Sequence, residues 1–86
     1  MLTEYIEEAM KRAKFKRLPE NEGYFGTVSG FRGVWANAPT IKACRVELQS
    51  VLEDWLLIKI RHNDDDLPVV RGMNLNPRPR AKKRVA

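Results

Sequence analysis

The chain has 86 residues, one cysteine and a formal net charge of +5. This length suffices for one domain but not for two, and so small a domain buries a modest share of its surface, which favours self-association. A lone cysteine, Cys44, excludes an intrachain disulfide and a cysteine-based metal site and favours a reducing compartment. No apolar run is long enough for a signal peptide or a membrane span, so we expect a cytoplasmic protein without membrane contacts.

The excess positive charge lies at the C-terminal end of the chain. Residues 1–76 contain eleven Lys and Arg and eleven Asp and Glu, so their formal charges cancel. The last ten residues carry five basic side chains and no acid. We therefore predict one neutral domain over residues 1–72 and a flexible basic tail over 73–86. Weak, sequence-independent nucleic-acid binding by that tail would use Arg78, Arg80, Lys82, Lys83 and Arg84.

The predicted elements follow one another with short turns. Residues 2–13 have the apolar spacing of an amphipathic helix. Residues 14–18, 24–29 and 34–38 predict three strands of an antiparallel meander, because glycine-rich turns separate them. A long helix follows Thr40, its predicted N-cap, and Leu67 to Val70 predicts a short edge strand because Pro68 cannot donate a ladder hydrogen bond. The expected fold is α+β: a small antiparallel sheet of three to four strands packed against a long amphipathic helix, plus an N-terminal helix.

Catalytic chemistry is not indicated. The predicted strands carry no Asp or Glu, whereas a metal-dependent nuclease needs several carboxylates that converge on divalent metal. We therefore predict no enzyme activity, no catalytic residue, no metal site and no cofactor. The single histidine, His62, is expected to place a favourable charge at a helix C-terminus. Cys44, Trp35 and Trp55 are expected in the core.

Two kinds of residue are candidates for binding a partner. Tyr24 and Phe25 are neighbours on a strand, so their side chains point to opposite faces and one of them is left as an exposed anchor. Two acidic clusters are candidate contacts for a basic protein. They are Glu20 with Glu22, and Asp64, Asp65 and Asp66.

The order of these motifs resembles the HicB-like antitoxin family. The resemblance rests on "GYFGTVSGFRGVWA" from Gly23 to Ala36, "PTIKAC" from Pro39 to Cys44 and a helix through "VLEDWL" from residue 51 to 56. It covers roughly residues 13–72. Ser29 and Arg32 stand where the family pattern often has prolines. The resemblance implies a reduced ribonuclease-H-like core.

The same resemblance implies a function in binding. HicB-like antitoxins block a small basic RNA-cleaving toxin, HicA, by protein–protein contact, and we expect a homodimer or a higher homo-oligomer. Operator binding in the family uses an added C-terminal domain, and the fourteen residues after Gly72 are too few for one, so autoregulation is not expected. The alternatives are a stand-alone homodimeric module that binds nucleic acid weakly through its tail, and a degenerate nuclease.

Overall fold

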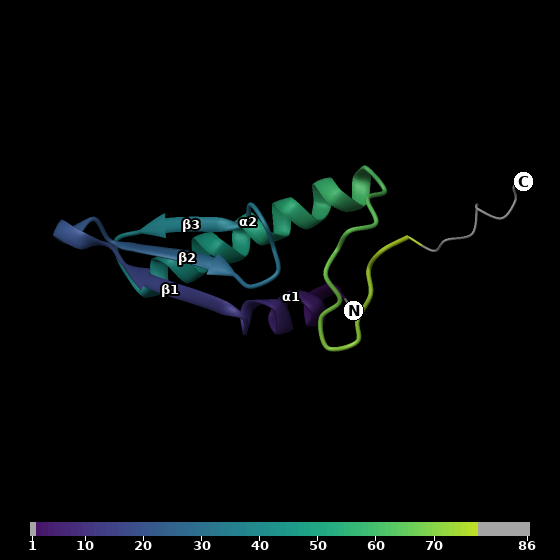
Figure 1. The fold of residues 1–86 in the computed structure, drawn as a ribbon, viewed down its shortest axis with the longest axis horizontal. Helices are drawn as coiled ribbons and strands as arrows, with labels where there is room; N and C mark the ends of the chain where they lie inside the picture. Colours follow the sequence, from purple (N-terminus) through teal and green to yellow (C-terminus); the bar gives the residue numbers. More distant parts are fainter. Residues whose placement is uncertain (1, 78–86) are drawn as a thin grey trace, which may run out of the picture.

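The computed structural model describes residues 2–77, and Figure 1 shows an elongated α+β domain. Its elements are α1 (Leu2–Met10), β1 (Ala13–Arg17), the 3-10 turn η1 (Pro19–Asn21), β2 (Tyr24–Val28), β3 (Trp35–Ala38) and α2 (Ile41–Arg61). The predicted fold class, a small antiparallel sheet with one long helix and an N-terminal helix, is confirmed. None of the helices within residues 2–77 is both long and apolar enough to cross a membrane.

The sheet is the predicted meander, with strand order β1-β2-β3 and antiparallel pairing throughout. Lys16 lies opposite Phe25, and Phe25 lies opposite Asn37. Lys14, Thr27 and Trp35 form a second such row. This register decides which side chains share a face of the sheet.

The helix α2 covers one face of the sheet and continues beyond it (Figure 1). Thr40 caps it as predicted, since its Oγ1 accepts a hydrogen bond from the Ala43 amide at 3.0 Å. Its buried residues recur every fourth position. Close packing depends on Gly26, where an added Cβ would lie 3.0 Å from the Phe15 ring. The buried α2 side chains are Cys44, Leu48, Leu52 and Leu56.

Beyond the sheet, α1 and α2 enclose a second group of buried side chains together with the segment after α2. Tyr5 is fully buried, and its hydroxyl donates to the Pro68 carbonyl. Burial raises the pKa of Tyr5, which keeps the hydroxyl protonated as a donor. The Phe31 ring contacts the Tyr5 and Trp55 rings edge-on, with centroid distances of 6.2 and 5.4 Å. The rings thus join α1 to the β2–β3 loop and α2, and the Tyr5 hydroxyl joins α1 to the segment after α2.

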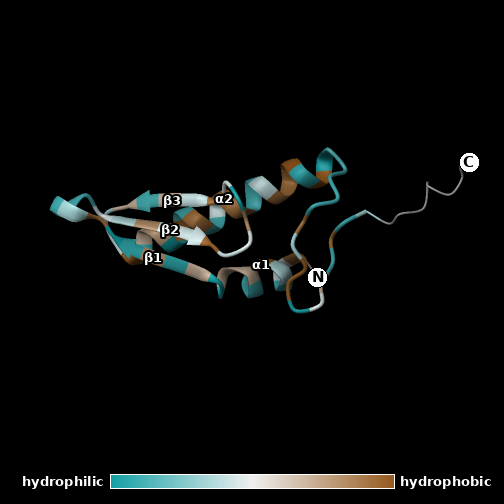
Figure 2. Cartoon of the chain, viewed as in Figure 1, coloured by the Kyte–Doolittle hydropathy of each residue, from teal (hydrophilic) through white to brown (hydrophobic). Residues whose placement is uncertain are grey.

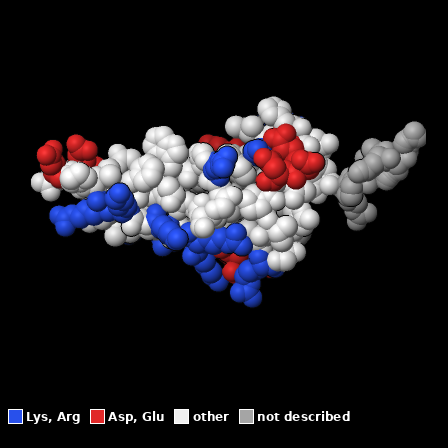
Figure 3. Space-filling view, viewed as in Figure 1, with Lys and Arg blue, Asp and Glu red and all other residues white. Residues whose placement is uncertain are grey.

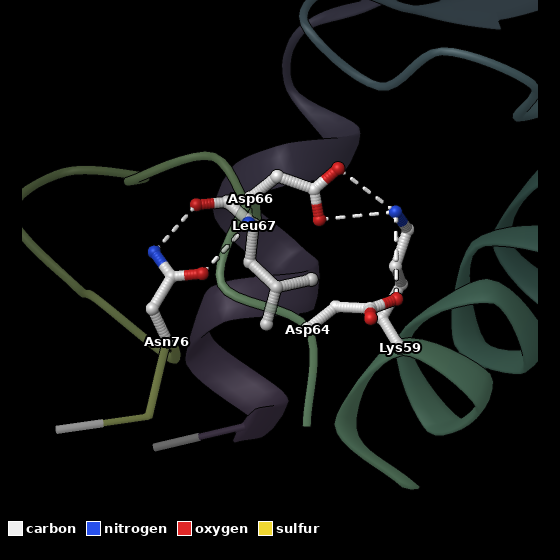
Figure 4. A network of polar contacts seen from close by, with 5 residues as sticks. All are labelled: Lys59, Asp64, Asp66, Leu67 and Asn76. Carbon is white, nitrogen blue, oxygen red and sulfur yellow. Dashed lines mark hydrogen bonds and ion pairs between the residues drawn. The ribbon is translucent and has the colours of Figure 1, made fainter. Parts of the chain in front are cut away.

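The predicted fourth strand does not join the sheet. Within the described part of the chain, Val70 pairs only with Met73 in an isolated bridge, and the Pro68 carbonyl is taken by Tyr5. Contacts also continue past the predicted domain end at residue 72. The Asn76 side chain accepts from the Leu67 amide at 2.7 Å and donates to its carbonyl at 2.9 Å, which closes the loop between them (Figure 4).

Candidate interaction surfaces

One face of the sheet is not covered by a helix, and it is called the open sheet face below. Side chains alternate along a strand, and β1 presents Phe15 to α2, where Arg45 lies 5.3 Å from its ring centroid. The residues on the other side of the sheet therefore point away from α2. They are Lys14, Lys16, Phe25, Thr27, Trp35 and Asn37.

The open sheet face carries a pair of aromatic rings. Phe25 and Trp35 stack with centroids 5.7 Å apart and an interplanar angle of 27°. Trp35 remains 55% exposed, so its predicted place in the core is wrong. The cause is the register: Ala36 and Ala38 are the β3 residues buried against α2, and alternation places Trp35 on the other side. Of the pair Tyr24 and Phe25, Phe25 is the one on the open face.

Basic side chains concentrate beside these rings. Residues 11–17, "KRAKFKR", contain five Lys and Arg and no acid. Figure 3 shows Lys and Arg side chains gathered along the edge of the molecule that follows β1 and the neighbouring end of α1. A domain with no net charge thus has a strongly basic side, which the charge count over residues 1–76 did not predict.

The helix side of the molecule has the opposite character. On α2 a surface turned away from the sheet, called the outer α2 face, combines exposed apolar residues with acids. Val46 is 65% and Leu57 is 59% exposed, and Figure 2 shows apolar segments continuing along α2 beyond the sheet. Residues 46–58 contain three acids and no Lys or Arg. The outer α2 face consists of Val46, Ser50, Glu53, Asp54 and Leu57. Glu47 instead lines a hollow beside Trp35 and Asn37 of β3.

The predicted acidic contacts lie at opposite ends of the molecule. Glu20 and Glu22 belong to the β1–β2 connection, whereas Asp64 to Asp66 follow the far end of α2 (Figures 1 and 3). A 21-residue helix spans about 30 Å, so the two clusters do not form one patch. Tyr24, the other predicted aromatic contact, is half-buried on the α2 side. Its backbone carbonyl accepts a hydrogen bond from the side-chain Nδ2 of Asn37 at 2.9 Å.

Two of the three aspartates stabilise the end of α2. Lys59 donates to the two Asp66 carboxylate oxygens at 2.9 and 3.0 Å and lies 3.7 Å from Asp64 (Figure 4). This hydrogen bond lowers the pKa of Asp66 and raises the pKa of Lys59. Lys59 also lies 5.2 Å from the Trp55 ring centroid. Asp64 and Asp66 are therefore partly committed to an internal contact with Lys59, although Asp66, like Asp65, is exposed.

Cys44 and His62 have structural positions. Cys44 is fully buried beneath the sheet, with Sγ 3.6 Å from the carbonyl oxygens of Tyr24 and Ala36, and burial raises its thiol pKa. His62 is the C-cap of α2, as predicted. Within residues 2–77 no three His, Cys, Asp or Glu side chains gather as metal ligands would. The predicted nucleic-acid contacts Arg78, Arg80, Lys82, Lys83 and Arg84 lie outside the described residues.

These features define a small α+β domain with a meander sheet, one covering helix and two chemically distinct surfaces. A family model described as UPF0150-like matches residues 4–68. The match spans most of the chain, so the protein belongs to the UPF0150-like family.

A solved structure is similar over nearly the whole chain. It is the crystal structure of TTHA0281 from Thermus thermophilus, with 35% sequence identity and a TM-score of 0.80. The similarity covers 90% of this chain and 94% of that one. A comparison with curated proteins finds no match.

Proposed function

We propose that the protein is an antitoxin-like binding protein of HicB type, which sequesters a small basic HicA-type RNA-cleaving toxin by protein–protein contact. The observation that carries the proposal is the outer α2 face. Exposed apolar area beside acidic side chains is a composition expected of a docking surface for a basic protein.

Two properties of the outer α2 face complement a basic partner. Val46 and Leu57 offer apolar area that is exposed in the single chain, and burying it would stabilise a complex. Glu53 and Asp54 supply negative charge, which steers a basic protein toward the face and sets its orientation. Sequestration requires only such complementarity, which agrees with strands that carry no acid.

The proposal includes a homodimer, which forms through a different surface from the toxin contact. In the sheet order β1-β2-β3, β3 is an edge strand whose outer side pairs with no other strand of residues 2–77. A second copy that added its own β3 there would satisfy the free backbone groups. Light scattering on the purified chain should therefore give the mass of a dimer, and a monomer at all concentrations would remove this part.

The toxin proposal is tested by co-purification from the native host. We expect the wild-type chain to recover a small basic protein in stoichiometric amount, and equimolar chain to suppress RNA cleavage by that protein once it is purified. A Glu53→Lys, Asp54→Lys, Leu57→Glu variant should lose this partner. The matched control, Lys14→Glu with Lys16→Glu on the open sheet face, should retain it. Recovery of the chain alone, or RNA cleavage that the chain does not suppress, contradicts the proposal.

The two predicted acidic clusters are tested in the same experiment. Charge reversal of Asp64 to Asp66, and separately of Glu20 with Glu22, tests the contacts predicted from sequence. Each cluster that belongs to the interface should weaken toxin binding when reversed, and unchanged affinity excludes that cluster. A Phe25→Ala and a Tyr24→Ala variant test the two aromatic contacts in the same way.

A further inference from the structure

We propose that the open sheet face binds single-stranded nucleic acid, with bases stacked on Trp35 and Phe25 and phosphates held by Lys14 and Lys16. This site is separate from the outer α2 face that carries the proposed toxin contact. It also differs from the nucleic-acid contacts predicted at Arg78 to Arg84, because it lies on the three-stranded sheet.

The aromatic pair supplies a platform for bases. Trp35 is 55% exposed and is stacked on Phe25 rather than packed into the core. A large ring held rigidly at the surface by its neighbour loses little conformational freedom when a base stacks on it. Stacking of this kind does not depend on base identity, because every base has an apolar face.

The lysines supply the phosphate contacts. Lys16 lies directly opposite Phe25, and Lys14 lies in the same cross-strand row as Trp35, two strands away from it. Strands are about 4.8 Å apart, so rings and ammonium groups lie within the reach of a few nucleotides. None of the three strands carries an acid, and the neighbouring Lys11 and Arg12 extend the positive charge along the edge in Figure 3.

The positive charge of the open sheet face determines which kind of partner can bind there. A second copy stacked face to face would bring the lysines of two chains together, and like charges in contact destabilise such an interface. A basic toxin is disfavoured for the same reason. Duplex nucleic acid offers phosphates, but its bases are already stacked on one another and reach the rings only after unpairing. Single strands present free base faces and phosphates together.

The test uses the full chain and a fluorescein-labelled twelve-nucleotide oligouridylate, with the corresponding oligodeoxythymidylate and a duplex as comparisons. Fluorescence anisotropy at low salt should show tighter binding to either single strand than to the duplex. Trp35→Ala should weaken single-strand binding about tenfold, whereas Trp35→Phe should restore most of it. Lys14→Ala with Lys16→Ala should reduce the slope of log K against log salt by about 1.4. The control Lys42→Ala, on α2, should change little.

A second readout separates the sheet from the tail. In a Trp55→Phe variant Trp35 is the remaining tryptophan, so its emission reports on the open sheet face. Quenching by the oligouridylate at the concentrations that change anisotropy supports the proposal. Binding with unchanged Trp35 emission, unaffected by the Trp35 and lysine substitutions, assigns it to the tail and overturns the proposal. Equal affinity for duplex and single strand, or no binding at low salt, also overturns it.

The two proposals fail separately. The Glu53→Lys, Asp54→Lys, Leu57→Glu variant should still bind the oligouridylate, and the Lys14, Lys16 and Trp35 variants should still recover a basic partner. A chain that binds the oligonucleotide without any toxin keeps this inference while the toxin proposal falls.

Discussion

The open sheet face and the outer α2 face lie on opposite sides of the same core and have opposite chemistry. The first combines stacked aromatic rings with lysines. The second combines exposed Val46 and Leu57 with Glu53 and Asp54. Both are available for the same physical reason: a three-stranded sheet with one covering helix has only two layers, so each layer leaves one side bare.

The difference between the two faces shows how a domain with no net formal charge can carry a basic surface and an acidic surface. Charges over residues 1–76 cancel in number, but residues 11–17 hold five Lys and Arg and no acid, whereas residues 46–58 of α2 hold three acids and no Lys or Arg. A basic segment next to the sheet and an acidic segment of the helix thereby lie on different layers. Each face can favour one kind of partner and repel the other kind, which is a source of specificity.

The largest expected effect comes from a substitution in the core that lies between the two faces. Leu52→Ala removes a fully buried α2 side chain and should lower the free energy of unfolding by about 2–5 kcal/mol. Leu57→Ala, on the outer α2 face of the same helix, should change it by less than about 0.5 kcal/mol. Urea unfolding followed by circular dichroism measures both. Equal midpoints for the two variants would contradict the assignment of the faces of α2.

The two tryptophans give the next largest difference. Trp55→Ala removes a ring packed on Phe31 and should lower the free energy of unfolding by about 2 kcal/mol or more. Trp35→Ala loses an exposed ring and its stack on Phe25, which should lower it by no more than about 1 kcal/mol. Thermal unfolding of the two variants measures the difference. A larger loss for Trp35→Ala would place that ring in the core, as the sequence alone predicts.

The connection between β1 and β2 fixes which side chains of these strands face outward, and Gly23 lies in it. Gly23 has φ +94, and an added Cβ would lie 2.5 Å from the Ala38 carbonyl oxygen. Gly33 has φ +84 with nothing near its Cβ position, so Gly33→Ala should lower the free energy of unfolding by about 1 kcal/mol through the backbone alone. Gly23→Ala should lower it further because of the clash. Equal losses in urea unfolding would show that the strands adjust without strain.

The smallest effect concerns the acidic end of α2. The Asp66 pKa is lowered by Lys59, so this pair stabilises the fold above the ordinary pKa of an aspartate and is lost as the pH falls through the folded value. Asp66→Asn should therefore lower the melting temperature slightly near neutral pH and leave it unchanged in strong acid. Asp65→Asn, the exposed neighbour, is the control. The same shift for both variants at every pH would contradict a specific role for the ion pair.

Much of the fold could be predicted from local patterns. The glycine turns, the Thr40 cap and the apolar spacing of α2 act between near neighbours, so the sequence contains their signals. The fourth strand was predicted, but Val70 pairs only with Met73 among the described residues, and the hydroxyl of Tyr5, 63 residues earlier in the chain, donates to the Pro68 carbonyl. The extent of the domain was also set by a tertiary contact, the pairing of Asn76 with Leu67.

The candidate surfaces were predicted less well. A clue to the open face was present in "KRAKFKR" and in the neighbours Tyr24 and Phe25, yet only the register with β3 places Trp35 beside Phe25. The two acidic clusters share their chemistry, and the length of α2 separates them.

The sequence by itself determined the elements, their order and the alternation within each strand, because backbone preferences and periodicity are local. Tertiary structure alone decided which face of each strand is covered, since that depends on a single helix packing across the sheet. It also decided that the basic segment 11–17 and the acidic segment 46–58 lie on different layers of the molecule. The location of a side chain on one layer or the other is a property of packing and register, and no segment of the chain encodes it alone.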